Sequence, residues 1–420
     1  MKILMLAGKK NGEKGFMNLV GTTLLDQAPH PDLELVVVIP SYDEPDLEQC
    51  LNSLLACQNG QGIVEVLVII NYPESASEKV KSKSLQTYRD LLQKYRASSP
   101  ARILIYPVLV PLPDRKAGVG LARKTGMDEA QRRFRQLERP NGIIVNLDAD
   151  CMVAPNYLVS IQSFFKAHPQ IWAAGVQFEH HLSPHLAEQQ KRAIVEYELH
   201  LRYFISAQRW IGLPFAFQTV GSCMAVQCEP YQKMGGMNNR KAGEDFYFLH
   251  KYIDVNRFAE INDTTVFPSS RASSRVPFGT GRAIKASLDG VSQKTYSWDS
   301  FAQLEVLIET LPDLYRSSCQ AWIANLPMVL GAFLGANDGL QKLEEIKRET
   351  SKYETFRCRF FQWFNAFRLM KYLHFARDYF PDRPVVLQAS EFMSKIDPTY
   401  VYSAASGLLD KYRKRARRGH

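Results

Sequence analysis

The sequence predicts an α/β fold with a mixed, mostly parallel sheet and flanking helices, followed by a helical C-terminal region. Two observations lead to this prediction. Between residues 35 and 250, short β-branched runs alternate with stretches of helical periodicity, the pattern of strands joined by crossover helices. Beyond about residue 300 the alternation stops and helical patterns continue alone. A chain of 420 residues is long enough to bury a large core.

Each predicted strand is a short apolar run with a helical stretch after it. The first run, Leu35–Pro40, is mainly valine and isoleucine and ends at a proline, and Glu44–Cys57 then places leucines at helical spacing. The other predicted strands are residues 64–71, 102–110, 142–147 and 171–178, and the other predicted helices are 77–95, 119–137, 156–167 and 186–207. We therefore expect an N-terminal extension at 1–34, one domain at 35–299 and a helical region at 300–420.

Cysteine usage and hydropathy predict a cytoplasmic protein. The seven cysteines are an odd number without a Cys-x-x-Cys pair, which favours a reducing compartment over a disulfide framework or zinc site. The apolar start Met1–Leu6 is followed by lysines, the reverse of a secretory signal. No apolar run reaches the roughly 18 residues of a membrane span.

The net charge of +9 is concentrated in a basic tail, Lys411–Arg418, with six basic residues in eight positions. One interpretation is a solvated, frayed helix end. The other is attraction to an anionic membrane surface, which would make the protein peripheral to the inner face of a membrane. Nucleic acid is not an expected partner, because no recognition motif accompanies the charge.

An aromatic stripe also bears on whether the protein contacts a membrane. Phe360, Trp363, Phe364, Phe367 and Met370 fall on one helical stripe with basic residues beside them. Such a stripe is either part of the core or a lipid-facing surface, and the core interpretation is favoured.

Polar motifs follow three of the predicted strands. The loop Pro40–Glu44 leaves the first strand, Asn71-Tyr72 the second, and Asp148-Ala-Asp150 the fourth. Because ligands bind outside the carboxyl ends of strands in open α/β sheets, one crevice is expected to collect all three motifs. An Asp-x-Asp pair on extended backbone points both carboxylates to the same side, which suits a hard cation such as Mg²⁺ or Mn²⁺. Alternatively, it is an Asp-rich surface turn that holds nothing.

Four segments, in this order and rough spacing, resemble the family 2 nucleotide-sugar glycosyltransferases of the GT-A type over about residues 35–255. The segments are VVVIPSYDEPDLEQCLNSLL, KAGVGLARKTGMDEA, NLDADCMVAPNYL and GGMNNRKAGEDFYFLHKY. The resemblance implies a Rossmann-like nucleotide half at 35–150 and an acceptor half at 151–299. It also implies a Mn²⁺ or Mg²⁺ cofactor, a nucleoside diphosphate sugar donor, and an acceptor that is a glycan, a lipid-linked molecule or a small molecule.

The resemblance also implies roles for individual residues. Asp245 corresponds to the general base of inverting members, with Glu244 as the alternative. Asp148 and Asp150 would hold the metal. The residues implied to bind the nucleotide sugar are Pro40, Tyr42, Asp43, Asn71, Lys116, Gly120, Arg123, Asp148 and Gly236.

The sequence departs from the family pattern at three places, which affects the expected base preference and processivity. Asn71-Tyr72 stands where paired aspartates usually read the base, and Lys124 replaces an asparagine. The Gln-x-x-Arg-Trp signature of processive members is absent after Asp245, and Gln208-Arg209-Trp210 is only a superficial echo of it. Transfer of a single sugar is therefore expected.

The Ser-, Gly- and Arg-rich loop 269–282 carries Arg271, Arg275 and Arg282. It is either a lid that closes over the diphosphate or a plain solvated connection.

Two rival functions remain. A sugar nucleotidyltransferase should show a Gly-rich phosphate loop after its first strand, which Pro40–Glu44 lacks. A non-catalytic nucleotide-sugar-binding protein would have no need to retain Asp148, Asp150 and Asp245.

Overall fold

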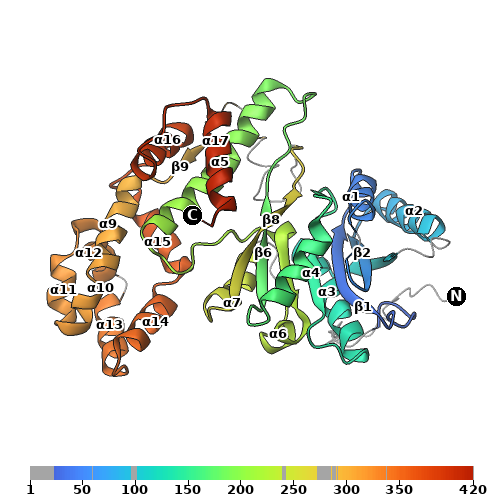
Figure 1. The fold of residues 1–420 in the computed structure, drawn as a ribbon, viewed down its shortest axis with the longest axis horizontal. Helices are drawn as coiled ribbons and strands as arrows, with labels where there is room; N and C mark the ends of the chain where they lie inside the picture. Colours follow the sequence, from blue (N-terminus) through green and yellow to red (C-terminus); the bar gives the residue numbers. More distant parts are fainter. Residues whose placement is uncertain are drawn as a thin grey trace.

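The computed structural model describes residues 23–58, 60–95, 102–238, 243–271, 285, 290, 292–336 and 338–419. An eight-stranded sheet runs through the molecule in the order β3-β2-β1-β4-β7-β6-β8-β5 (Figure 1). Its strands are β1 Leu33–Ser41, β2 Ile63–Pro73, β3 Ile103–Leu112, β4 Ile143–Asn146, β5 Met152–Val153, β6 Ala173–Phe178, β7 Met224–Gln227 and β8 Phe258–Phe267.

The sheet is mixed and mostly parallel, as predicted. Strands β1 to β4 run parallel to one another in the Rossmann-like order 3-2-1-4. β7 pairs antiparallel with both β4 and β6, β8 continues parallel to β6, and β5 closes the edge antiparallel to β8. The five predicted strands are confirmed, whereas β5, β7 and β8 were not predicted.

Helices cover both faces of this sheet, and alternate residues of β1 pack against the helices on opposite faces. Val36 and Val38 belong to the core cluster beneath α3, while Leu35 and Val37 belong to a second cluster beneath α1 and α4. The helices up to β8 are α1 Leu47–Leu55, α2 Glu78–Tyr95, α3 Val119–Gln136, α4 Tyr157–Ala167, α5 Glu188–Trp210, α6 Cys228–Lys233 and α7 Glu244–Ile253, with a 3₁₀ helix η1 at Gly221–Cys223.

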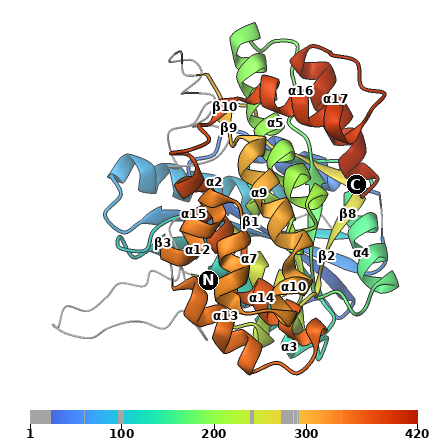
Figure 2. The same ribbon diagram turned by 90° about the vertical axis from the view of Figure 1, so that its left-hand side faces the viewer.

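The C-terminal region is helical, as predicted, and Figure 2 shows its helices in front of the sheet. Its helices are α9 Trp298–Glu309, α10 Leu311–Arg316, α11 Cys319–Asn325, α12 Met328–Ala336, α13 Gly339–Arg348, α14 Tyr353–Trp363, α15 Ala366–Ala376, α16 Val385–Ile396 and α17 Ala405–Arg417. A short antiparallel pair joins the segment before α9, β9 Lys294–Thr295, to the segment between α15 and α16, β10 Arg383–Pro384.

The aromatic stripe of the sequence belongs to the core. Phe360 and Phe364 are fully buried, so a lipid-facing surface is wrong for these residues. The stripe is also divided between two helices, because α14 ends at Trp363 and Asn365 caps the start of α15. Its Oδ1 accepts the N–H groups of Phe367 and Arg368 at 3.1 and 3.2 Å.

The basic tail is a docked helix, α17, and not a frayed end. Arg413 donates to Glu198 at 2.8 and 2.6 Å, and Arg417 donates to Glu179 at 2.7 Å. These two residues are therefore engaged within the protein, and attraction of the other basic residues to a membrane stays a prediction. Among the described residues, no helix combines the length and apolar character that crossing a membrane requires.

Candidate functional site

The loops that follow β1, β2, β3 and β4 lie at one edge of the sheet, because these strands are parallel. Several hydrogen bonds connect them. Asp114, after β3, accepts the N–H and Oγ–H of Ser75, after β2, at 2.9 and 2.8 Å. The Sγ–H of Cys50 on α1 donates to the carbonyl of Asp148, after β4, at 3.6 Å. The predicted motifs thus share one edge of the fold.

Arg123 joins the fourth-strand motif to the acidic pair. From α3 its guanidinium donates to Asp148 and to Glu244, each at 2.5 Å, and the arginine is 4% exposed. Gly221 of η1 makes room for this group, because a Cβ there would lie 2.4 Å from Nη1 of Arg123. Burial opposes the charge of Arg123, but Asp148 and Glu244 raise its pKa further than burial lowers it.

Glu244 and Asp245 occupy different environments although they are adjacent at the start of α7. Glu244 is 2% exposed and is paired with Arg123. Asp245 is half-buried, and its Oδ1 accepts the N–H of Phe246 at 2.8 Å. Burial raises the pKa of Asp245 to about 6, with Glu244 and Asp148 adding to the rise and Arg123 opposing it. This pKa is suited to proton transfer near neutral pH.

The Asp148-Ala-Asp150 motif forms a turn and not extended backbone. β4 ends at Asn146, and the N–H of Cys151 donates to the carbonyl of Asp148 at 3.0 Å. The prediction that both carboxylates point to the same side of an extended strand is therefore wrong. The chain reverses here because β5 must pair with β8. Both aspartates are half-buried, and one Asp148 oxygen is already bound to Arg123.

The loop after β1 is held by charged groups. Pro40 lies within β1, Tyr42 is 38% exposed, and Asp43 has a φ of 46° and forms an ion pair with Lys83. Arg271, which follows β8, donates to Glu44 at 2.7 and 2.9 Å and to Asp46 at 2.7 Å.

Arg271 follows a strand in the other half of the sheet, and its hydrogen bonds therefore hold the first loop in place. Asp150 is among the groups that raise its pKa, which is consistent with a position near the aspartate turn. The other two arginines of the predicted lid, Arg275 and Arg282, lie outside the described residues.

Asn71 and Tyr72 lie inside β2, because this strand extends to Pro73. The Nδ2 group of Asn71 donates to the carbonyls of Ser41 and Ile69 at 3.1 and 3.2 Å, and the side chain is buried. Through Nδ2 this amide therefore connects the ends of β1 and β2. A role of Asn71 in base recognition stays a prediction.

Lys116 and Gly120 lie at the junction between β3 and α3. Lys116 is half-buried in the connecting turn, where its N–H donates to the carbonyl of Pro113 at 2.9 Å. Gly120 is buried in the first turn of α3, on the N-terminal side of Arg123.

Gly236 belongs to a turn that α6 and α7 hold from two sides. Gly235 and Gly236 have φ angles of 75° and 67°, which favour glycine. Lys251 of α7 donates to the carbonyls of Met234 and Gly236 at 3.0 and 2.8 Å.

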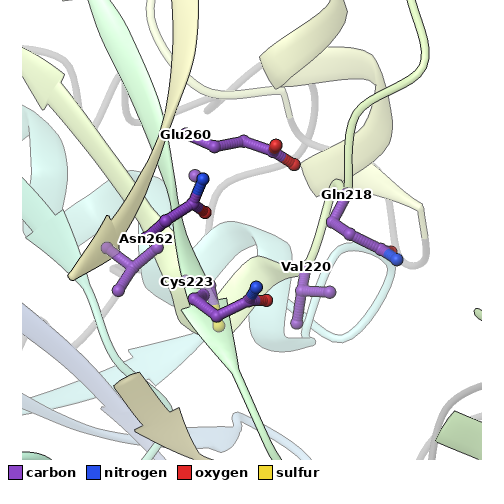
Figure 3. Close-up of a pocket in the computed structure, with 8 residues that line it drawn as sticks. Gln218, Val220, Cys223, Glu260 and Asn262 are labelled. Atoms are coloured by element: carbon purple, nitrogen blue, oxygen red, sulfur yellow. The ribbon is translucent and has the colours of Figure 1, made fainter. Parts of the chain in front are cut away.

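A small polar cavity of about 10 Å³ lies beside the Arg123 cluster (Figure 3). Val220 and Cys223 line it and flank Gly221, against which Arg123 packs. No local sequence pattern points to these residues, because they come from β6, β8 and the segment before β7 and meet only in the folded sheet. The cavity is lined by Gly175, Val176, Gln177, Gln218, Val220, Cys223, Glu260 and Asn262.

The family model described as "Glycosyl transferase family 2" matches residues 36–235. This region is a family 2 glycosyltransferase domain. The family 2 domain contains the first loop, Arg123, the aspartate turn and Gly221, and its match ends before the acidic pair Glu244-Asp245. The family description thus gives this domain the class of a glycosyltransferase.

Solved structures similar to this chain include those of S. aureus TarS 1–349. TarS 1–349 alone shares 13% identity, covering 76% of this chain and 92% of that chain at a TM-score of 0.40. The complex with UDP-GlcNAc shares 14% identity, covering 92% of this chain and 93% of that chain at a TM-score of 0.40. No curated protein matches this chain.

Proposed function

We propose that this family 2 glycosyltransferase moves one sugar from a nucleoside diphosphate sugar to an acceptor hydroxyl, with inversion and with a divalent cation. The observation that carries the proposal is Asp245, a carboxylate with a pKa of about 6 beside the Asp148–Arg123–Glu244 cluster. The nucleotide half at 35–150 and the acceptor half at 151–299 are part of this proposal.

Asp245 acts as the general base. The acceptor hydroxyl attacks the anomeric carbon of the donor, the bond from that carbon to the diphosphate oxygen breaks, and Asp245 takes the hydroxyl proton. The electron pair of the broken bond leaves with the nucleoside diphosphate. Glu244 is less suited to this step, because its carboxylate is buried against Arg123.

Asp150 and the second oxygen of Asp148 would hold Mn²⁺ or Mg²⁺. Their donor atoms are oxygens, which suit hard cations. Among the described residues, no group of three or more His, Cys, Asp and Glu side chains is placed to hold a metal alone, so the donor diphosphate and water would complete the coordination. When bound, the cation neutralises charge on the diphosphate leaving group.

Three groups of residues would bind the rest of the donor. Tyr42 and Asp43 lie on the first loop, where the nucleoside would rest. Lys116 and Arg271 supply positive charge near the diphosphate, and the Gly236 turn lets the donor sugar approach the backbone. The acceptor class stays open among glycans, lipid-linked molecules and small molecules.

The metal assignment is tested with Asp150→Ala and the exposed control Asp90→Ala. Binding of a panel comprising UDP-glucose, UDP-N-acetylglucosamine and GDP-mannose is measured by calorimetry with and without Mn²⁺. We expect Asp150→Ala to abolish the gain from Mn²⁺ without changing the circular dichroism spectrum, and Asp90→Ala to behave as wild type. An unchanged Mn²⁺ dependence in Asp150→Ala would show that the metal site lies elsewhere.

A further inference from the structure

A groove of about 530 Å³ lies away from the Arg123 cluster, where the C-terminal ends of α16 and α17 approach the C-terminal end of α5. α16 and α17 both pack against α5 (Figures 1 and 2). The volume is in the range of ligand sites, roughly 300–1,000 Å³. The groove is lined by Ser206, Arg209, Trp210, Gly212, Leu213, Pro214, Ala216, Phe217, Glu260, Ile396, Arg415 and Gly419.

Trp210 gives the groove an accessible aromatic wall. The side chain is 44% exposed, although its Nε1–H donates to Glu305 at 3.1 Å and so fixes the ring. Lys395 of α16 lies 5.9 Å from the ring centroid, which places a second cation near the rim. An exposed ring held in one orientation suits stacking against the apolar face of a sugar.

Arg415 gives the groove its positive charge. The neighbouring arginines of α17 are engaged elsewhere, Arg413 with Glu198 and Arg417 with Glu179. Inside the groove Arg209 and Glu260 neutralise each other through an ion pair of 2.5 Å. Arg415 therefore remains as the lining cation with no neutralising partner among the lining residues, and it comes from the basic tail.

The groove continues toward the proposed site. Glu260 lines both the groove and the small cavity, and the chain from Ala216 to Val220 runs along both. Arg209 fixes this chain by donating to the carbonyl of Ala216 at 3.0 Å. Gly221, next to the lining residue Val220, packs against Arg123. The Arg209–Glu260 pair thus stands between an outer groove and an inner polar cavity.

We propose that this groove binds a negatively charged sugar segment of the acceptor, so that the acceptor is an extended glycan carrying a phosphate or carboxylate group. This inference rests on the proposed glycosyl transfer. Trp210 stacks on a sugar ring, Arg415 pairs with the anionic group, and the reacting hydroxyl lies beyond the Arg209–Glu260 pair. A single tryptophan beside polar, glycine and charged lining residues favours a sugar over a lipid surface, which would need a broader apolar face.

Binding is tested by calorimetry with trehalose 6-phosphate and its neutral counterpart trehalose. We expect the phosphorylated sugar to bind at least roughly tenfold more tightly, because an arginine–phosphate hydrogen bond is charge-assisted. Arg415→Ala should remove this difference and Trp210→Ala should weaken both sugars. Lys414→Ala, an exposed neighbour on the same helix, should leave both affinities unchanged. Equal affinities for the two sugars, no measurable binding of either, or an Arg415→Ala variant that still discriminates would overturn the proposal.

The acceptor role is tested by nucleoside diphosphate release in a screen of matched neutral and phosphorylated oligosaccharides. We expect phosphorylated members to be accepted, with Arg415→Ala raising KM and leaving kcat unchanged. Acceptance of neutral members alone would overturn the inference, as would a KM unaffected by Arg415→Ala.

Two parallel measurements separate the alternatives. Co-sedimentation with phosphatidylserine vesicles that is lost in Arg415→Ala, combined with no sugar phosphate binding, would make the groove a membrane contact and overturn the glycan proposal. Binding of the nucleotide-sugar panel is measured on the same variants. Normal sugar phosphate binding without any nucleotide-sugar binding would count against the proposed transfer and not against the groove.

Discussion

Arg123 organises the site at the scale of single residues. Its guanidinium is the one group that contacts both the aspartate turn and the acidic pair in the described structure, through Asp148 and Glu244. A buried cation between two carboxylates holds the groups in place, because Glu244 would be left as an unpaired buried charge without Arg123 and Arg123 would lose part of its compensation without either carboxylate. Gly221 is part of the same arrangement, since its lack of a side chain provides the space for the guanidinium.

Gly221→Ala should therefore disturb the site. Its Cβ would lie 2.4 Å from Nη1 of Arg123, so the guanidinium or η1 must move. We expect a loss of unfolding free energy of about 1–3 kcal/mol in urea denaturation, together with weaker binding of nucleotide sugars. Gly335→Ala in α12 is the control, because a Cβ there meets open space. Unchanged stability and donor binding in Gly221→Ala would contradict this account of the cluster.

The pKa of Asp245 predicts the pH dependence of transfer. The base is active when deprotonated, and burial raises its pKa to about 6. Activity should therefore fall as the pH drops through about 6 and level off above it. In a pH profile of kcat/KM, we expect this acidic limb in the wild type.

Asp245→Asn should lose transfer while binding nucleotide sugar as before, because an amide cannot accept the hydroxyl proton. Near-normal turnover in this variant would assign the base to Glu244 or indicate a retaining reaction.

At the scale of elements, α17 is held to the domain by a buried charge network. Glu198 of α5 is buried and bonds with Arg413 of α17, Arg202 of its own helix and His180 after β6. Burial works to raise the pKa of Glu198, but Arg202, Arg413 and His180 bring it well below its ordinary value. This contribution to stability is present above the ordinary carboxyl pKa and is lost as the pH falls toward the folded-state pKa.

Arg413→Ala should loosen this helix. Two hydrogen bonds to a buried carboxylate are lost, and we expect a decrease in unfolding free energy of about 2–3 kcal/mol. Lys414→Ala, at the exposed next position, should change it by less than about 0.5 kcal/mol. Thermal and urea unfolding of both variants provide the measurement. Equal stabilities of the two variants would mean that α17 is not held by this network.

The sequence predicted well those strands and helices whose hydrophobic pattern lies within one continuous run of residues. Five of the six strands and all five α-helices of the described chain up to residue 210 were predicted, because their apolar periodicity is local. The docking of α17 was not predicted, because Arg413 and Glu198 are 215 positions apart. β7 was missed because its four residues, Met224–Gln227, contain a single β-branched side chain. The turn at Asp148 depends on the pairing of β5 with β8.

At the scale of the whole molecule, the site could be predicted in part. The rule that ligands lie at the carboxyl ends of parallel strands is sufficient to place the first loop and the aspartate turn at one edge from the sequence alone. The contacts between the loops at this edge could not be predicted. Arg271 meets Glu44, and Gly221 makes room for Arg123, only in the folded sheet.

The sheet and the C-terminal helices share one hydrophobic cluster, whose members range from Leu33 to Tyr412. The ring of Tyr203 on α5 packs between Phe301 of α9 and Phe392 of α16, with centroid distances of 6.1 and 5.5 Å. A division at residue 299, which the change of pattern in the sequence suggests, would expose this face of α5.

The fragment ending at residue 299 should therefore fail to fold by itself. Removing α9 and α16 leaves Tyr203 and its buried neighbours in water, and burying one large side chain is worth about 1.5–3 kcal/mol. Loss of several such side chains is comparable with the roughly 5–15 kcal/mol that typically separates folded from unfolded states. We expect circular dichroism and urea titration of the fragment to show no cooperative transition, whereas the full chain unfolds with Trp fluorescence and circular dichroism changing together. A fragment with a cooperative transition and normal nucleotide-sugar binding would instead make residues 300–420 an independent domain.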